Sequence, residues 1–331
     1  MKAPPWKKLP APFLERLDAI IPSPSLRDVR ESFCRAKLPA FRANTLKISG
    51  PELKKRLTAL RIRVQAIDWY RDAFLLEEPS QREFEGTELY EQGCVYIQNP
   101  SSMIPPLVLR PEPGETVLDI AAAPGSKTTQ VAALMQNTGH ILANDTSRIR
   151  LYKLGANLRL QGVTNTTLSN VSGQGLWKRH PERFDRTLVD VPCSLEGLIQ
   201  CDFPRTYQNW SVKKIHTLSR LQRYLLRSAV SATKVGGIIV YSTCTLAPEE
   251  NEGVIDWILR KEAGRLEIEE VGLKVPRSLA GLTRWDDKTF DQGVRQCVRI
   301  LPSDVMEAFF VARLRKTAST VPALDESEDA T

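Results

Sequence analysis

Apolar positions alternate between strand-like and helical spacing from about residue 115 to residue 260. Short apolar runs predict strands at residues 116–120, 140–143, 167–168, 186–190 and 237–241. Helical spacing predicts helices over residues 127–136, 147–160 and 212–234, and a further helix that begins at Pro248. Strands that alternate with helices in this way indicate an α/β fold with a Rossmann-like, doubly wound and mostly parallel sheet. Ligands of such sheets bind beyond the carboxyl ends of the strands, so functional residues are expected there.

The two ends of the chain have different patterns. Residues 1–40 show helical spacing, residues 41–48 and 62–78 resemble strands, and Ser49 precedes a short helix. We expect residues 1–85 to form a small N-terminal α+β unit and residues 86–316 to form the doubly wound domain, closed by strands near 294–301 and 307–314. Residues 317–331 are small, polar and acidic, which predicts a disordered tail.

Composition indicates a folded protein with a polyanionic partner. The 331 residues are 42% hydrophobic and carry a formal net charge of +7, which rises to +11 over residues 1–316 because the last fifteen residues hold four acids and no base. Such an excess favours a nucleic acid as partner. The longest apolar runs fall far short of the ~20 residues that span a bilayer, and the N-terminus lacks a signal-peptide core. We therefore expect no membrane association and a cytoplasmic location.

Cysteine and histidine spacing predicts no metal site. The six cysteines, at positions 34, 94, 193, 201, 244 and 297, include no C-x-x-C pair, and the three histidines show no ligand pattern. In a protein without an export signal the thiols are expected to be reduced.

A nucleoside cofactor is predicted by two motifs that follow strands. Residues 119–128, with small side chains between a strand and a helix, would let a ligand approach the backbone and the helix N-terminus. The segment matches neither a Walker A loop nor G-x-G-x-x-G. Asp145 ends the next strand and could accept both hydroxyls of a ribose, or else cap the following helix. S-adenosylmethionine fits better than NAD, because the glycine pattern for a pyrophosphate is absent.

Two cysteines follow neighbouring predicted strands directly. Cys193 lies in Asp190-Val-Pro-Cys-Ser and Cys244 in Ser242-Thr-Cys-Thr. Because the carboxyl ends of parallel strands meet at one edge of a sheet, both thiols should lie near the reactive end of the cofactor. A disulfide between them is the competing interpretation, and a reducing compartment disfavours it.

With these motifs, the chain resembles the Sun/Nop/Rsm family of RNA cytosine-5 methyltransferases over roughly residues 30–315. The matching motifs are D-x-x-A-A-P-G-x-K-T, D-x-P-C-S and S-T-C-T in this order, supported by Arg-Ala-Asn-Thr-Leu at 42–46 and by residues 96–102, 248–251 and 309–312. The resemblance implies a class I methyltransferase fold and S-adenosylmethionine as cofactor. It implies cofactor contacts from Ala121, Ala122, Ala123, Pro124, Gly125, Ser126, Lys127, Asp145, Arg150, Asn170 and Asp190. It also implies that Cys244 is the nucleophile and that Cys193 assists release of the methylated RNA.

The sequence departs from the family pattern at several positions. Ser126 and Leu195 stand where the family usually has glycine, and Leu195 is expected to narrow the base pocket. Asn170 stands near the place of an aspartate that contacts the adenine amino group, which bears on affinity rather than chemistry. Ser303 replaces the histidine of a Pro-His pair.

Cytosine chemistry explains why these residue types are needed. Carbon 5 is a weak nucleophile until a thiolate adds to carbon 6, and Lys127 and the sulfonium would favour that thiolate. Asp190 can hydrogen-bond the exocyclic amine and ring nitrogen 3. A base, which the sequence does not identify, must remove the carbon-5 proton. The target base must be flipped out or single-stranded to expose the attacked face.

Two other functions are compatible with parts of the pattern. An amino-group methyltransferase would carry an aromatic residue where Cys193 stands, and an inactive RNA-binding assembly factor would not require Cys193, Cys244, Lys127 and Asp190. The RNA partner can be ribosomal or transfer RNA, with a slight preference for ribosomal RNA from the family. Basic residues of the N-terminal unit, namely Arg35, Lys37, Arg42, Lys54 and Lys55, are expected to contact RNA phosphates. We expect a monomer.

Overall fold

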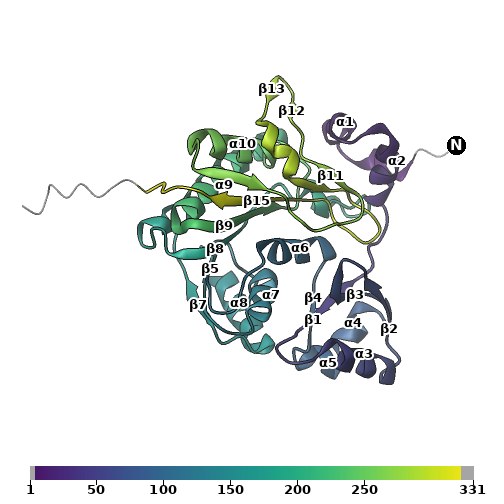
Figure 1. Cartoon of the computed structure of the whole chain (residues 1–331). Coiled ribbons are helices and arrows are strands. Elements are labelled where there is room, and N and C mark those ends of the chain that lie inside the picture. Colours follow the sequence, from purple (N-terminus) through teal and green to yellow (C-terminus); the bar gives the residue numbers. More distant parts are fainter. Residues whose placement is uncertain (1–3, 322–331) are drawn as a thin grey trace, which may run out of the picture.

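The computed structural model describes residues 4–321 and contains a twisted nine-stranded sheet with helices on both faces (Figure 1). Five central strands run parallel in the order β9-β8-β5-β6-β7, and antiparallel β15 pairs with β9. Three short strands, β10, β11 and β14, extend the sheet beyond β9, with β10 and β14 both pairing with β15. The predicted doubly wound, mostly parallel core is confirmed. The strands are β5 (Thr116–Asp119), β6 (His140–Asn144), β7 (Thr166–Ser169), β8 (Phe184–Asp190), β9 (Thr233–Thr243), β10 (Leu266–Glu269), β11 (Ser278–Ala280), β14 (Val298–Ile300) and β15 (Phe309–Lys316).

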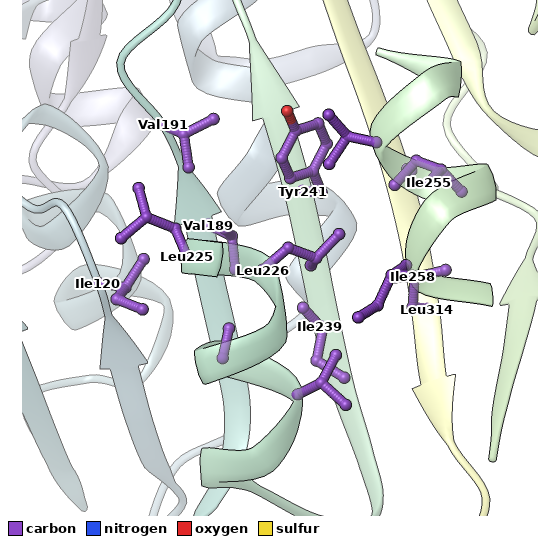
Figure 2. Packing of buried hydrophobic residues seen from close by; sticks show 14 of the residues in the cluster. Ile120, Val189, Val191, Leu225, Leu226, Ile239, Tyr241, Ile255, Ile258 and Leu314 are labelled. Atoms are coloured by element: carbon purple, nitrogen blue, oxygen red, sulfur yellow. The ribbon is translucent and has the colours of Figure 1, made fainter. Parts of the chain in front are cut away.

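Alternate residues of the central strands pack against helices on opposite faces of the sheet. Leu118, Val189 and Ile239 belong to a cluster with α9 (Val212–Ala232) and α10 (Glu252–Lys261), which Figure 2 shows. Their neighbours Val117, Leu188 and Ile238 pack on the other face, against α6 (Pro100–Leu109) and α7 (Ser126–Leu134). Strands buried on both faces are apolar throughout, which explains the continuous apolar runs in the sequence. The helix α8 (Arg148–Gln161) packs beside α7, and the 3-10 helix η2 (Gly173–Lys178) packs on α9.

The N-terminal region consists of two parts rather than one unit. An antiparallel sheet in the order β2-β3-β1-β4 carries three short helices and has its own apolar core. Its strand β4 lies past residue 85, where the sequence places the boundary, because β4 pairs with β1. The elements are β1 (Ala40–Ala43), α3 (Gly50–Ala59), β2 (Arg63–Ile67), β3 (Tyr70–Glu78), α4 (Gln81–Glu85), α5 (Glu88–Glu91) and β4 (Val95–Ile97).

The strand predicted over residues 41–48 ends early. The chain turns after Ala43, where the Asn44 carbonyl accepts hydrogen bonds from the amides of Lys47 and Ile48. The Asn44 side chain also accepts from the Leu46 amide, so an asparagine stops the strand by bonding its own backbone.

The first helices pack on the large domain and not on the N-terminal sheet. Apolar residues of α1 (Ala11–Ile20) and α2 (Ser23–Ser32), among them Phe13 and Val29, share a cluster with Ile199 and Leu246. Figure 1 shows this helical pair at the side of β11, apart from α3–α5. The short 3-10 helices η1 (Pro5–Lys8), η3 (Glu196–Leu198), η4 (Pro204–Thr206) and η5 (Gln292–Gln296) and the hairpin β12 (Arg284–Trp285) and β13 (Lys288–Thr289) complete the described elements.

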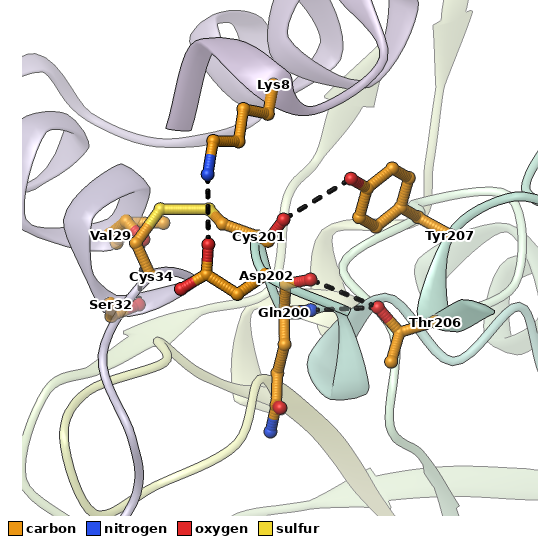
Figure 3. The surroundings of a disulfide bond; sticks show 9 residues. All are labelled: Lys8, Val29, Ser32, Cys34, Gln200, Cys201, Asp202, Thr206 and Tyr207. Atoms are coloured by element: carbon orange, nitrogen blue, oxygen red, sulfur yellow. Dashed lines mark hydrogen bonds and ion pairs between the residues drawn. A yellow bond between two sulfur atoms is a disulfide. The ribbon is translucent and has the colours of Figure 1, made fainter. Parts of the chain in front are cut away.

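A disulfide joins Cys34, just after α2, to Cys201 in the loop that follows Cys193 (Figure 3). The prediction of reduced thiols is therefore wrong for these two residues. Packing brings them together across 167 residues of sequence, since the Cys201 amide donates to the Phe33 carbonyl and Lys8 pairs with Asp202. No local sequence motif predicts this disulfide, because the distance between the two cysteines depends on how α2 packs against the loop that contains Cys201. Cys94, Cys193, Cys244 and Cys297 are free.

The predicted disordered tail lies mostly outside the described residues, which end at position 321. Within the described part, the Thr317 amide donates to the Arg265 carbonyl. Over residues 4–321, no helix combines the length and apolar character that a membrane crossing requires.

Candidate active site

A pocket of about 390 Å³ opens at the carboxyl ends of β5, β8 and β9. A second pocket of about 200 Å³ adjoins it and shares Ala121, Arg150 and Pro192 with it. The first pocket is lined by Asp119, Ala121, Ala122, Ala123, Pro124, Ser126, Lys127, Arg150, Asp190, Val191, Pro192, Cys193, Leu195 and Cys244. The structure therefore brings together both predicted cysteines and most of the predicted cofactor loop.

Side chains of α8 contact the small-residue loop between β5 and α7 and fix its backbone. Gly125 has a φ of +111°, and a Cβ at this position would lie 2.6 Å from the Leu154 side chain, so glycine is required. The Asn157 amide donates to the Pro124 carbonyl at 2.8 Å, and the Arg150 guanidinium donates to the Ala123 carbonyl. These contacts keep the loop backbone close to the pocket.

Asp145 presents a buried oxygen to the second pocket. Its Oδ1 atom accepts a hydrogen bond from the Ser147 amide at 2.9 Å. Its Oδ2 atom lies 3.2 Å from Arg150 Nη1 but is buried without a hydrogen-bond partner. The helix cap is Ser147, whose hydroxyl accepts from the Arg150 amide, so Asp145 is not needed as the cap. A buried carboxylate oxygen that has an ion-pair partner but no hydrogen bond can still accept one from a ligand, and a ribose hydroxyl fits that place.

Asn170 lies outside both pockets and is exposed. Its Nδ2 atom donates to the Asp145 carbonyl at 2.7 Å, and its Oδ1 atom accepts from Arg148. In this structure Asn170 thus holds the backbone of Asp145.

Lys127 and Asp190 form an ion pair in the first pocket, with 2.7 Å between Nζ and Oδ2. The Lys127 ammonium also donates to Ser102 Oγ at 2.8 Å, and Asp190 Oδ1 accepts from Ser242 Oγ at 2.7 Å. Both oxygens of Asp190 therefore have a fixed orientation.

Asp119, at the end of β5, is buried. Burial raises the pKa of Asp119 to about 7, although Thr128 donates a hydrogen bond to its carboxyl group.

The sulfur atoms of Cys193 and Cys244 are 3.3 Å apart. Cys193 is buried and Cys244 is partly exposed to the pocket. The hydrogen bond with Cys244, together with burial, raises the pKa of Cys193 well above its ordinary value. Cys193 is thus a thiol at neutral pH and can donate its proton to the neighbouring sulfur.

Two buried carboxyl groups that the sequence analysis did not single out hold the loop around Cys193. Glu250 accepts hydrogen bonds from the Ser194 amide and from Gln222, and burial raises its pKa to about 7. Glu196 accepts from Trp210, from the Thr245 hydroxyl and from the Leu246 amide, and so links the Cys193 loop to the Cys244 loop. The Pro-Glu-Glu-Asn segment at 248–251 is the sequence feature that includes Glu250. The role of Glu250 could not be predicted from it, because its contacts are with Ser194 and Gln222, which are distant in sequence.

The expectation that Arg42 contacts RNA phosphates is wrong. Its side chain is buried, lies over the Tyr96 ring and donates to Gln98, Thr129 and the Ser126 carbonyl. Arg42 therefore joins the N-terminal sheet to the cofactor loop. Lys37 is also engaged, because its ammonium donates to the carbonyls of Ser303 and Met306, and Arg35 pairs with three carboxylates. Lys54 and Lys55 remain exposed.

Among residues 4–321, no three side chains of His, Cys, Asp or Glu gather in a way that could hold a metal ion. The two pockets are lined by the backbone of a small-residue loop, by the Asp145 carboxylate, which pairs with Arg150, and by two thiols. These groups fit a nucleoside cofactor and a base substrate.

Comparisons with known proteins agree with this geometry. Residues 106–315 match the family of 16S rRNA methyltransferase RsmB/F, and residues 9–100 match the N-terminal domain of 16S rRNA methyltransferase RsmF. The chain is 40% identical to the tRNA (cytosine(49)-C(5))-methyltransferase of Pyrococcus abyssi, over 84% of this chain and 88% of that protein. It is 39% identical to ribosomal RNA small subunit methyltransferase F of Vibrio cholerae, over 94% of this chain and 64% of that longer protein.

A solved structure of a methyltransferase homolog protein from Pyrococcus horikoshii has a TM-score of 0.82 at 33% identity, and the match covers 96% of this chain and 100% of that one. Fold and site thus define an S-adenosylmethionine-dependent methyltransferase of class I. The chain belongs to the RsmB/F family of RNA cytosine-5 methyltransferases.

Proposed function

We propose that this protein methylates carbon 5 of a cytosine in ribosomal RNA through a covalent adduct with Cys244. The adduct is supported by the two sulfur atoms 3.3 Å apart at the pocket, of which Cys244 is the accessible one. Ribosomal RNA is supported by the match of residues 9–100 to the N-terminal domain of 16S rRNA methyltransferase RsmF. Transfer RNA is the second candidate, because the Pyrococcus abyssi relative is named for it and matches over most of its length.

The cofactor groove extends through both pockets. We assign the ribose hydroxyls to Oδ2 of Asp145, which pairs with Arg150 but accepts no hydrogen bond, and the rest of the cofactor to the backbone of residues 121–127. Arg150 and Asn170 act by positioning, the first on the Ala123 carbonyl and the second on the Asp145 carbonyl. Bound S-adenosylmethionine supplies an electrophilic methyl carbon on a sulfonium.

The residues of the first pocket divide the reaction between them. The Cys244 thiolate forms a bond to carbon 6, the C5=C6 electron pair becomes a C4=C5 bond, and the C4=N3 pair moves onto ring nitrogen 3, which takes up a proton from solvent. The Asp190 carboxylate, oriented by Lys127 and Ser242, accepts hydrogen bonds from that nitrogen and from the exocyclic amine. Carbon 5 is thereby made nucleophilic and takes the methyl group, and the electron pair of the broken methyl–sulfur bond stays with the cofactor sulfur.

Release of the product requires the reverse movement of electrons. A base removes the carbon-5 proton, the C5=C6 bond forms again, the bonding pair of C6–S returns to the Cys244 sulfur, and ring nitrogen 3 gives its proton back to solvent. The Cys193 thiol, whose pKa is raised by Cys244 and by burial, donates a hydrogen bond to that departing sulfur. This assigns attack to Cys244 and release to Cys193.

The test is methylation of defined RNAs. The wild-type protein and Cys244→Ala are incubated with labelled S-adenosylmethionine and unmodified transcripts of small-subunit ribosomal RNA or transfer RNA, followed by nucleoside analysis. We expect label in 5-methylcytidine of ribosomal RNA with wild type only. Label in transfer RNA alone would select the second candidate, N-methyl nucleosides would indicate an amino-group methyltransferase, and no label would indicate an inactive RNA-binding factor.

Binding of the RNA outside the pocket is assigned to the N-terminal sheet, where Lys54 and Lys55 project from α3. We further propose that the protein acts as a monomer in the cytoplasm, where ribosomal and transfer RNA are substrates. Gel filtration with light scattering, with and without the transcript, tests the monomeric state.

A further inference from the structure

We propose that Leu195 is a substrate-contacting residue, which packs on the target cytosine while Cys244 attacks it. This inference rests on the proposed function. Leu195 lines the first pocket together with Cys193, Cys244 and Asp190, and it is absent from the lining of the second pocket that contains Asp145. It therefore lies at the end of the groove where the base must enter.

The backbone of Leu195 has an unfavourable conformation. Its φ of +64° and ψ of 31° are left-handed, a region that suits glycine and strains a bulky side chain. Eight non-glycine residues in the described chain have a positive φ, and Leu195 is the single aliphatic one among them. Leu195 is also 41% exposed. Contacts within the protein therefore do not compensate fully for either the strain or the exposure.

The surrounding loop keeps Leu195 in this conformation. On one side, the Ser194 amide donates to Glu250, and on the other, the Glu196 carboxyl group accepts from Thr245 and Leu246. Gly197 closes the loop, because its amide donates to the Cys244 carbonyl and a Cβ there would lie 2.4 Å from the Ala308 carbonyl. A glycine at position 195 would relieve the backbone strain without disturbing these hydrogen bonds. We therefore infer that the leucine side chain contacts a ligand rather than stabilising the loop.

The position of Leu195 in the pocket favours an apolar contact between its side chain and the cytosine ring. The reaction needs a cytosine ring held against a sulfur atom, with water kept away from the adduct. A leucine in the same lining as the two thiols supplies an apolar surface for the ring, while Asp190, which also lines the pocket, supplies the polar contacts.

The test compares kcat/KM for the methylated transcript in Leu195→Gly, Leu195→Met and, as a matched control, Leu198→Ala. Leu198 is similarly exposed on the same loop but does not line the pocket. We expect Leu195→Gly to lower kcat/KM for RNA about tenfold, as for loss of a partly buried apolar contact. The KM for S-adenosylmethionine should stay unchanged and the unfolding temperature should not fall. Leu195→Met should retain activity within about threefold, since it keeps the apolar surface, and Leu198→Ala should match wild type.

Several results would overturn the inference. An RNA kcat/KM of Leu195→Gly within twofold of wild type would show that the side chain does not contact the substrate. A lower unfolding temperature, or a parallel loss with S-adenosylmethionine, would assign Leu195 to the fold or to the cofactor. Failure of wild type to methylate either RNA would overturn the proposed function, and this inference with it. If wild type methylates RNA and Leu195→Gly is equally active, only the inference about Leu195 is refuted.

Discussion

Cys193 and Cys244 are 51 residues apart in sequence, yet their sulfur atoms lie 3.3 Å from each other in a shared hydrogen bond. The hydrogen bond with Cys244 and burial raise the pKa of Cys193, which keeps it a thiol, and the exposure of Cys244 makes it the sulfur that a substrate can reach. The two thiols are therefore not interchangeable. This asymmetry leads to the first prediction.

Cys244→Ala should abolish both turnover and any covalent protein–RNA species, because no sulfur would remain at the attacking position. Cys193→Ala should form the bond and methylate once, but release slowly, so that a protein–RNA adduct survives denaturing gel electrophoresis. Both variants should retain the wild-type circular dichroism spectrum. An adduct trapped by Cys244→Ala and not by Cys193→Ala would mean that the two roles are exchanged, as in enzymes that attack with a Pro-Cys thiol.

Asp145→Ala should weaken binding of S-adenosylmethionine by about 1.5–3 kcal/mol, the usual contribution of hydrogen bonds to a charged group. The physical reason is the loss of the buried Oδ2 atom, which has no hydrogen-bond partner within the protein. Calorimetric titration measures the change. Asp145→Asn keeps the acceptor for the Ser147 amide and serves as the control for folding. Wild-type affinity for S-adenosylmethionine in a folded Asp145→Ala variant would show that Asp145 only stabilises its own turn, through the hydrogen bond from the Ser147 amide.

Glu250 should make stability fall as the pH rises through the slightly acidic range. Its pKa is about 7 in the folded protein, against an ordinary value of 4.5, because of burial. Between these values the native state holds a proton that the unfolded chain has released, so the contribution is fully present below pH 4.5 and is lost by about pH 7. It amounts to at most ~3 kcal/mol.

Comparison with Glu250→Gln isolates this contribution, because carboxylates such as Glu249 and Glu269 have lowered pKa values and act in the opposite direction. Urea unfolding at several pH values from 4.5 to 8 gives the difference between the two proteins. We expect wild type to lose stability relative to the variant as the pH rises. Parallel pH profiles would show that folding does not raise the pKa of Glu250.

Loss of the disulfide between Cys34 and Cys201 should destabilise the protein by about 2–5 kcal/mol, since the crosslink closes a loop of 167 residues in the unfolded chain. The double variant with serine at both positions should unfold at lower urea concentration, and a reducing agent should have the same effect on wild type. The double variant itself should not respond to the reducing agent. Equal stability of oxidised and reduced wild type would refute this prediction.

Neutralising Lys54 and Lys55 should flatten the dependence of RNA affinity on salt. If both contact phosphates, the slope of log affinity against log salt should decrease by about 1.4, at ~0.7 per contact with a single strand. The double variant with glutamine at both positions is compared with one that neutralises the engaged Arg35. An unchanged slope would remove α3 from the RNA-binding surface.

Local patterns in the sequence were sufficient to predict the doubly wound core and the edge of the sheet at which the candidate site residues meet. Strands β5, β6, β8 and β9 and helices α7, α8 and α9 lie within a few residues of their predicted ranges. The reason is that spacings of 2 and 3.6 residues and small-residue turns are properties of short segments. The convergence of Cys193 and Cys244 also followed, because parallel strands place their carboxyl ends at one edge.

Contacts distant in sequence were decided by the tertiary structure alone. Arg42 has the same charge as Lys54, but the docking of β1 against α7 buries Arg42 and leaves Lys54 in solvent. In the same way, the packing of α2 on the loop after Cys193 selects Cys34 and Cys201 as partners. A charge or a thiol acquires its role from the groups that surround it, and no pattern along the chain contains that information when those groups lie a hundred residues away.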